Sequence, residues 1–163
     1  MLTPSSVRWP TPRSYSVSLE EMYREVILDH YRNPRNRDPL DKIDATAEGN
    51  NPLCGDEVTI EVSLNGDTVD AISVRGQGCS ISQASASMMS KAVLGKTEKE
   101  VAEITDTFKK MMGVIDTDEN VVDDDRPGAT LGDLEALQGV RKFPVRIKCA
   151  DLAWTTLEEA LNR

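Results

Sequence analysis

The feature that most limits the possible folds is a β-hairpin predicted between the first two of the chain's three cysteines. Apolar and polar residues alternate over 58–64, which is the pattern of a strand with one buried face. Asn65-Gly66 is a strong tight-turn signal, and a return strand is expected over about 68–75. Cys54 lies just before this hairpin and Cys79 just after it. Because the entry and exit of an antiparallel hairpin lie side by side, these two cysteines are expected to meet.

Helical patterns surround the hairpin. A capping box at Ser18–Glu21 predicts the start of a first helix, which Asn33-Pro34 ends. A second capping box opens at Thr97, and Pro144 can open the last helix. The expected helices cover about 18–33, 80–94, 97–112, 131–138 and 144–162, with one short strand near 45–48. The order helix, sheet, helices predicts an α+β fold.

The composition limits the class of protein. We predict a single domain over 18–163, preceded by a disordered extension over 1–17 that contains three prolines and no acidic residue. The formal net charge of -9 argues against nucleic-acid binding and against attraction to anionic membranes. No apolar run reaches the length of a transmembrane helix. An odd number of cysteines favours a reducing cytoplasm over an extracellular disulfide framework.

The three cysteines are candidates for metal ligands, reactive thiols or plain buried residues. Cys54 is followed by Gly55-Asp56, Cys79 is placed near a helix N-terminus, and Cys149 lies in the first turns of the last helix. A helix N-terminus favours thiolate over thiol. Asp56 could instead cap a turn. Our interpretation is that Cys54, Asp56, Cys79 and Cys149 converge on one metal ion, with zinc favoured because it accepts thiolate and carboxylate donors.

A carboxylate in a thiolate-rich site suggests what the site is for. Carboxylate oxygen is a harder donor than thiolate and is less matched to such a centre, so the site should persist but open readily. The metal keeps thiols ionised, and a released thiolate is a strong nucleophile.

Other residues allow more than one interpretation. His30, the only histidine, has a core-facing helical spacing that favours packing or a structural hydrogen bond over catalysis. Arg146 shares a helix face with Cys149 and can hold a thiolate or persulfide, or pair with an acid. Lys148 is interpreted as a solvated side chain. The acidic run over 116–125 is expected to be a solvated mobile loop, with docking to a basic partner as the alternative.

Four separate motifs resemble those of the IscU/NifU-type iron–sulfur cluster assembly proteins, and the resemblance extends from about residue 18 to the C-terminus. The motifs are Leu28-Asp29-His30-Tyr31-Arg32-Asn33-Pro34, Asn51-Pro52-Leu53-Cys54-Gly55-Asp56, Gly76-Gln77-Gly78-Cys79-Ser80-Ile81-Ser82 and Arg146-Ile147-Lys148-Cys149-Ala150. The resemblance implies a three-stranded antiparallel sheet packed against about five helices. Two departures are similar to the SufU branch: Lys148 stands where scaffold proteins have His, and an extra segment occurs around 113–133.

The resemblance to this branch implies a zinc-dependent sulfurtransferase that works with a SufS-type cysteine desulfurase. Cys54 would be the catalytic residue that accepts the persulfide sulfur after a histidine of the desulfurase displaces it from zinc. Asp56, Cys79 and Cys149 would keep the metal. Downstream Suf cluster-assembly proteins are further candidate partners. The alternatives are a scaffold that assembles a [2Fe–2S] cluster, or binds iron, on the same ligands, and a structural zinc module that only binds partners.

Overall fold

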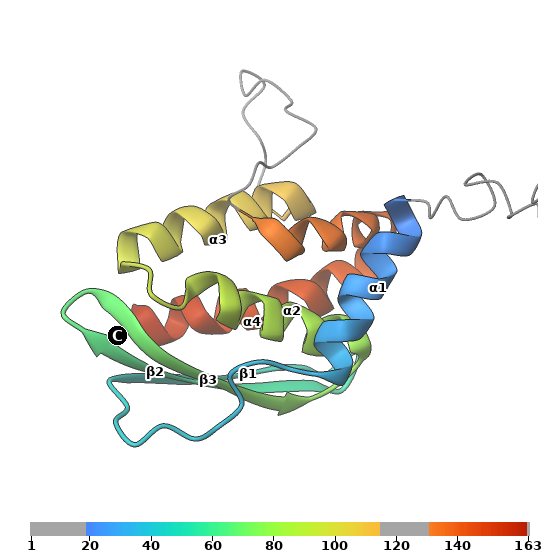
Figure 1. Ribbon diagram of the computed structural model, residues 1–163. Coiled ribbons are helices and arrows are strands. Elements are labelled where there is room, and N and C mark those ends of the chain that lie inside the picture. The colour runs from blue at the N-terminus through green and yellow to red at the C-terminus, as the bar shows by residue number, and fades with distance from the viewer. Residues whose placement is uncertain (1–18, 115–130, 163) are drawn as a thin grey trace, which may run out of the picture.

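The computed structural model describes residues 19–114 and 131–162 of the chain. The extension over 1–17, the Ser18 cap and the acidic run over 116–125 lie outside this range. The described elements are α1 (Leu19–Arg32), β1 (Ala45–Asn51), β2 (Asp56–Asn65), β3 (Thr68–Gln77), α2 (Ser80–Val93), α3 (Glu98–Met112), the 3₁₀ helix η3 (Gly132–Lys142) and α4 (Pro144–Leu161) (Figure 1). The predicted α+β class, with one three-stranded sheet and five helices, is confirmed.

The three strands form an antiparallel sheet in the order β1-β2-β3. The predicted apolar face of β2 is buried, from Val58 to Leu64. β1 is longer than its predicted span of 45–48 and pairs along its whole length, from Ala45 opposite Val62 to Asn51 opposite Asp56. Apolar and polar residues alternate over Ala45–Glu48, but Gly49-Asn50-Asn51 contains no apolar side chain, so pairing with β2 extends the strand beyond its sequence signal. This added length brings β1 directly to the Cys54 turn.

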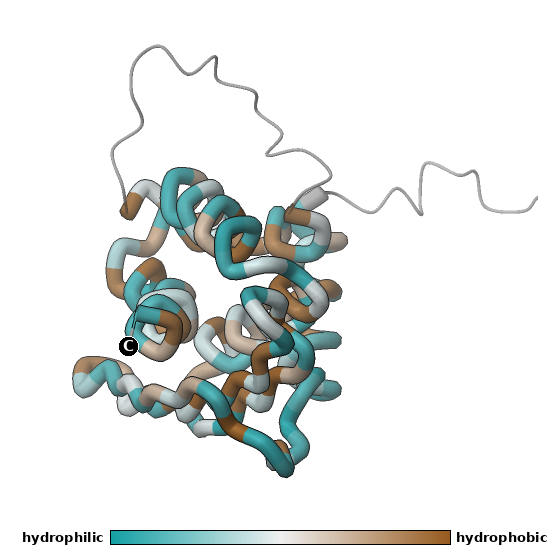
Figure 2. Tube along the Cα trace, turned by 90° about the vertical axis from the view of Figure 1, so that its left-hand side faces the viewer, coloured by the Kyte–Doolittle hydropathy of each residue, from teal (hydrophilic) through white to brown (hydrophobic). Residues whose placement is uncertain are grey.

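The helices lie on one side of the sheet (Figure 1). The connection over 33–44 begins against α2, where Arg35 N donates to Ser87 Oγ at 2.9 Å. It then passes the edge strand β3, where Asn36 O accepts from Val74 N at 2.8 Å. Hydrophobic and hydrophilic residues alternate along the helices (Figure 2). Phe108 of α3 and Trp154 of α4 stack with ring centroids 4.5 Å apart. Met88, Met89 and Met112 are buried core residues, and Met111 packs partly buried against the core.

A row of buried serines on α2 anchors its neighbours by hydrogen bonds. Ser85 Oγ donates to Ala150 O on α4 at 2.6 Å and accepts from Trp154 Nε1 at 3.2 Å. Ser87 Oγ contacts His30 Nδ1 on α1 at 2.8 Å. His30 is fully buried, and its Nε2 contacts Asp133 Oδ2 at 2.9 Å. The histidine therefore has the structural hydrogen bonds that its spacing favoured, and it joins α1, α2 and η3.

The helix ends follow the predicted signals, with one difference. Thr97 Oγ1 accepts from Glu100 N at 3.1 Å, and Gly113 ends α3 in the left-handed region. Beyond residue 131, the predicted short helix is longer than expected and is a 3₁₀ helix. Among the described residues, no helix combines the length and apolar character needed to cross a membrane.

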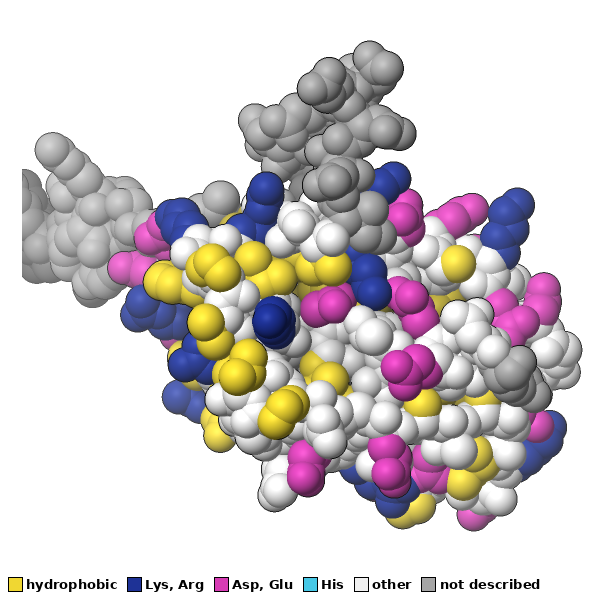
Figure 3. Space-filling model, turned by 180° about the vertical axis from the view of Figure 1, so that it is seen from behind, with side chains coloured by type: hydrophobic (Ala, Val, Ile, Leu, Met, Phe, Trp, Pro, Cys, Tyr) yellow, Lys and Arg dark blue, Asp and Glu magenta, His cyan; other side chains and the backbone are white. Residues whose placement is uncertain are grey.

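Three large apolar side chains near the cysteines in sequence remain exposed. They are Leu53, Phe143 and Val145, with 72%, 60% and 58% of their surface accessible. The rear view shows hydrophobic side chains gathered with lysines and arginines on the side where α1 lies (Figure 3). We call Leu53, Phe143 and Val145 the apolar rim, because each is close in sequence to Cys54 or Cys149.

The contact of β1 with α4 supplies a test of the fold. A Cβ at Gly49 would collide with Thr156 Oγ1, whereas a Cβ at Gly139 would meet nothing within 4 Å. Gly49→Ala is therefore expected to lower the free energy of unfolding by about 1–3 kcal/mol through overpacking. Gly139→Ala, the matched control, should leave it unchanged or raise it by up to about 1 kcal/mol. Urea unfolding of both variants checks this, and equal stabilities would contradict the β1–α4 packing.

Candidate metal centre

Cys54 lies in the tight turn over 52–55 that joins β1 to β2. Cys54 N donates to Asn51 O at 3.2 Å, and Leu53 N donates to Asn51 Oδ1 at 3.3 Å, so Asn51 closes the turn with its backbone and its side chain. Gly55 adopts a φ of 69°, a conformation that glycine reaches without a Cβ penalty. The turn leaves Cys54 half-buried at the end of the sheet.

Asp56 is the first residue of β2 and only 1% exposed. Its Oδ1 accepts hydrogen bonds from Cys79 N at 2.9 Å and from Ser82 Oγ at 3.1 Å. Its Oδ2 is buried and has no hydrogen-bond partner among the described residues. A buried carboxylate oxygen without a partner is costly unless a cation or a proton compensates it. The unpaired oxygen is the strongest structural sign that this site holds a cation.

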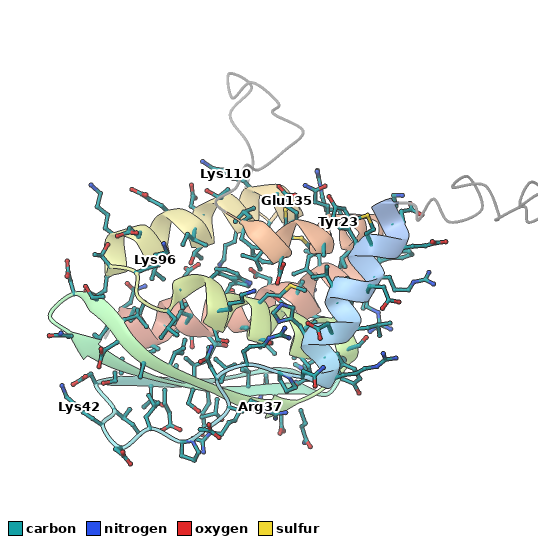
Figure 4. The ribbon with its side chains drawn as sticks, viewed as in Figure 1. Tyr23, Arg37, Lys42, Lys96, Lys110 and Glu135 are labelled. Carbon is teal, nitrogen blue, oxygen red and sulfur yellow. The ribbon has the colours of Figure 1, made fainter. Side chains whose placement is uncertain are left out.

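The connection from β3 to α2 passes very close to this carboxylate. A Cβ at Gly78 would collide with Asp56 Oδ1 and would lie 2.7 Å from Ser82 Oγ. Glycine at this position is therefore required by the close approach. Arg37, on the connection between α1 and β1, donates from Nη2 to Gly76 O at 3.1 Å (Figure 4). The connection over 33–44 thus helps to fix the segment that leads to Cys79.

Cys79 and Cys149 come from two helix starts. Cys79 is the N-cap of α2, in agreement with its predicted place near a helix N-terminus. Its sulfur accepts a hydrogen bond from Ser82 N at 3.5 Å. Cys149 lies on α4, fully buried, and its sulfur is 3.2 Å from that of Cys54. This separation is much longer than the roughly 2.05 Å of a disulfide, and all three cysteines are free.

Ligand atoms of Cys54, Asp56 and Cys149 all lie within 4.8 Å of one another. Tetrahedral zinc, with bonds of about 2.0–2.3 Å, requires neighbouring donors about 3.3–3.8 Å apart. The spacing of these three residues is compatible with such a site. Cys79 is outside this tight group, but its N–H is bonded to Asp56, so its backbone lies directly beside the group.

The electrostatics of the cysteines also favour a cation. Burial, together with the neighbouring side chains of Cys54, Asp56 and Cys79, raises the pKa of the Cys149 thiol far above its ordinary value. Without a cation the site therefore retains this proton. A divalent ion offsets the repulsion among several anionic donors and allows the thiol to ionise.

Arg146 is a positively charged neighbour of this group. The charge of Cys79 and a hydrogen bond to it raise the pKa of the Arg146 guanidinium, with smaller contributions from Cys149 and Cys54. Of the two interpretations that the sequence left open, contact with the thiols therefore agrees with the structure. Lys148 is exposed, in agreement with a solvated side chain.

Sequence reasoning missed two supporting residues. Ser82 holds Asp56, and Asn51 Nδ2 donates to Cys149 Sγ at 3.8 Å. The signal for Ser82 was its spacing, because a residue three positions after an N-cap faces that cap. Asn51 gave no comparable signal, because its contact joins residues that are far apart in the chain.

Comparisons with known proteins agree with this architecture. The profile of the NifU-like N-terminal domain family matches residues 22–162. The zinc-dependent sulfurtransferase SufU of Bacillus subtilis is 43% identical over 150 residues, which cover 92% of this chain and 96% of the relative. The iron–sulfur cluster assembly scaffold protein IscU of Streptococcus pyogenes is 40% identical over 145 residues, which cover 89% of this chain and 86% of the relative.

A solved structure has the same fold. The crystal structure of a protein from Fervidobacterium islandicum, assigned as an iron–sulfur cluster assembly scaffold of the SUF system, matches with a TM-score of 0.73 and 33% identity. The match covers 88% of this chain and 99% of that one. The names of these relatives include both a sulfurtransferase and scaffolds.

The unpaired oxygen of Asp56 leads to a prediction with two opposite effects. Asp56→Asn keeps an acceptor for Cys79 N–H but removes the buried negative charge. We expect the variant to bind zinc about 10–100-fold more weakly, while its metal-free form is at least as stable as the unmodified protein. Chelator competition and urea unfolding in excess chelator measure the two quantities. Glu57→Gln, on the exposed side of the same strand, is the matched control, and equal zinc affinities would refute the ligand role of Asp56.

The raised pKa of Cys149 predicts a pH effect in the metal-free protein. The folded state binds this proton more tightly than the unfolded chain, in which the ordinary value of 9.0 applies. The resulting stability is fully present below about pH 9 and is lost as the pH rises beyond it. Urea unfolding in excess chelator at about pH 8 and about pH 10.5 should show a larger loss for the unmodified protein than for Cys149→Ala. Identical losses would contradict the buried, protonated thiol.

Proposed function

The chain belongs to the NifU-like N-terminal domain family of iron–sulfur cluster assembly proteins, and we propose that it is a zinc-dependent sulfurtransferase acting with a SufS-type cysteine desulfurase. The observation that carries the proposal is the grouping, at one end of the sheet, of two cysteines and a buried aspartate that has one carboxylate oxygen without a hydrogen-bond partner among the described residues. The relative named as a zinc-dependent sulfurtransferase, at 43% identity, supports the choice of metal and activity. Lys148 before Cys149 supports it as well, as the departure that resembles the SufU branch.

The proposed ligands are Cys54, Asp56, Cys79 and Cys149. When bound, zinc keeps coordinated thiols deprotonated and does no redox chemistry of its own. Asp56 is held through Oδ1 by Cys79 N–H and Ser82, and its Oδ2 is buried without a protein partner among the described residues. Cys149 is buried within α4, and Cys79 is held at the start of α2. These three are placed to retain the metal.

Cys54 is the proposed catalytic residue because it is the ligand on a turn. Its thiolate attacks the outer sulfur of the desulfurase's cysteine persulfide. A new sulfur–sulfur bond forms on Cys54, the sulfur–sulfur bond of the donor breaks, and the donor cysteine leaves as a thiolate. The reaction exchanges one persulfide for another, so it needs no external oxidant or reductant.

Arg146 and the apolar rim serve this reaction in different ways. The Arg146 guanidinium lies beside the three cysteines and can neutralise the negative charge of a persulfide. Leu53, Phe143 and Val145 are exposed and close in sequence to Cys54 or Cys149, as expected for a surface that a protein donor covers. The persulfide sulfur would then pass to a downstream Suf cluster-assembly protein.

A scaffold that assembles a [2Fe–2S] cluster is the second candidate, favoured by the 40% identical relative named as an IscU scaffold. The same thiolate-rich set can bind iron. Anaerobic addition of iron and sulfide would then give a stable coloured cluster that transfers to an apo-protein. Retention of zinc under these conditions, with no productive cluster transfer, would favour the sulfurtransferase.

Reconstitution tests the proposed activity. The zinc-loaded protein is expected to stimulate alanine formation by its desulfurase, and Cys54→Ala should abolish the stimulation because no acceptor thiol remains. Mass spectrometry should locate the added sulfur on Cys54. Asn50→Ala, an exposed change on β1 outside the cluster, should behave as the unmodified protein. Normal stimulation by Cys54→Ala would refute the assignment.

A further inference from the structure

The three sulfurs of the cluster differ in the hydrogen-bond donors that surround them. Cys79 Sγ accepts from Ser82 N at 3.5 Å and is the principal partner of Arg146. Cys149 Sγ accepts from Asn51 Nδ2 at 3.8 Å. Within 19–114 and 131–162, no N–H or O–H group is a hydrogen-bond donor to the sulfur of Cys54; its contact is the Cys149 thiol. Two of the sulfurs are thus supported by N–H groups, and the third is not.

Hydrogen bonds of this kind change how firmly a sulfur is held. An N–H donor stabilises the negative charge on a thiolate and makes that thiolate a weaker nucleophile. It also fixes the orientation of the side chain, and partners of metal ligands commonly change metal affinity when they are removed. A thiolate without such a donor is the one that is released and reacts most readily.

We propose that Asn51 is a positioning residue that fixes Cys149 as a retained ligand, and thereby leaves Cys54 as the only cysteine free to open for sulfur transfer. This inference rests on the proposed function, because it concerns how the same ligand set is divided between holding and reacting. It assigns to Asn51 a role beyond closing the turn.

The position of Asn51 makes it suitable for this role. It is the last residue of β1, pairs with Asp56 across the sheet, and is only 8% exposed. Its side-chain amide makes two hydrogen bonds. Oδ1 accepts from Leu53 N in the Cys54 turn, and Nδ2 donates to Cys149 Sγ on α4. One side chain therefore fixes the spacing between the reactive turn and the buried helix.

A double-mutant cycle distinguishes an action through Cys149 from an action through the turn. Asn51→Ala is measured alone, with Cys54→Ala and with Cys149→Ala, and zinc affinity is obtained by chelator competition. We expect Asn51→Ala to weaken zinc binding about 10–100-fold alone and equally in the Cys54→Ala background. In the Cys149→Ala background the effect should fall to about two-fold or less. Asn50→Ala, on the exposed face of the same strand, is the matched control.

Two results would overturn the inference. One is an effect of Asn51→Ala no larger than that of Asn50→Ala. The other is an effect that disappears with Cys54→Ala and persists with Cys149→Ala, which would place the action of Asn51 in the turn alone. Failure of the unmodified protein to take up zinc would instead refute the proposed function and the inference together, so the two failures are distinguishable.

A measurement on the unmodified chain keeps the test valid if Asn51→Ala does not fold. The protein is loaded with the magnetically active isotope of cadmium, a tetrahedral substitute for zinc. Scalar coupling between the metal and the side-chain amide protons of Asn51 is expected, because the hydrogen bond to Cys149 connects them. The backbone amide proton of Ser82 should show the same kind of coupling to the metal through its hydrogen bond to the sulfur of Cys79. Coupling at Ser82 without coupling at Asn51 would overturn the proposal.

Discussion

The carboxylate of Asp56 connects the parts of this structure that must meet at the cluster. Its Oδ1 ties the start of β2 to the start of α2 through Cys79 N–H and Ser82 Oγ. These hydrogen bonds set the spacing between the sheet and α2. Glycine is the only residue type that this close approach allows at position 78. The same bonds leave Oδ2 buried and unpaired. One oxygen of Asp56 thus joins β2 to α2 by hydrogen bonds, and the other oxygen is left for a cation.

The cost of that unpaired oxygen explains why the surroundings are so heavily hydrogen-bonded. A buried carboxylate, a buried thiol with a raised pKa and two further thiols would repel one another once ionised. The rest of the structure resists this repulsion. The serines of α2 bond to α1 and α4, and the Phe108–Trp154 stack joins α3 to α4. The helices that carry Cys79 and Cys149 are therefore fixed before any metal binds, which lowers the cost of binding it.

How much of this arrangement the sequence could predict depended on whether the signal was local. The hairpin, the capping box at Thr97 and the start of α4 at Pro144 follow from short patterns, and each was found. β1 was predicted too short because its alternation ends at Glu48, and Gly49-Asn50-Asn51 is held in the strand by pairing with β2. Hairpin geometry predicted that Cys54 and Cys79 meet; in the structure the Cys79 N–H bonds to Asp56, while the sulfur of Cys54 contacts that of Cys149. Cys149 was assigned to the cluster from its place in the first turns of the last helix, and nothing local specifies how α4 crosses the sheet.

The difference between Cys54 and the other ligands has its origin in the elements that carry them. A helix N-cap and a buried helical position hold a side chain through the backbone of the whole element, whereas a short turn holds it through a few bonds. Moving Cys54 therefore disturbs the turn over 52–55, while moving Cys149 would disturb the packing of α4 against the sheet. A site built from one turn and two helix starts has its weakest point at the turn. Leu53 of the apolar rim belongs to this turn and is 72% exposed, so a partner that covers Leu53 meets the turn that carries the most easily displaced ligand.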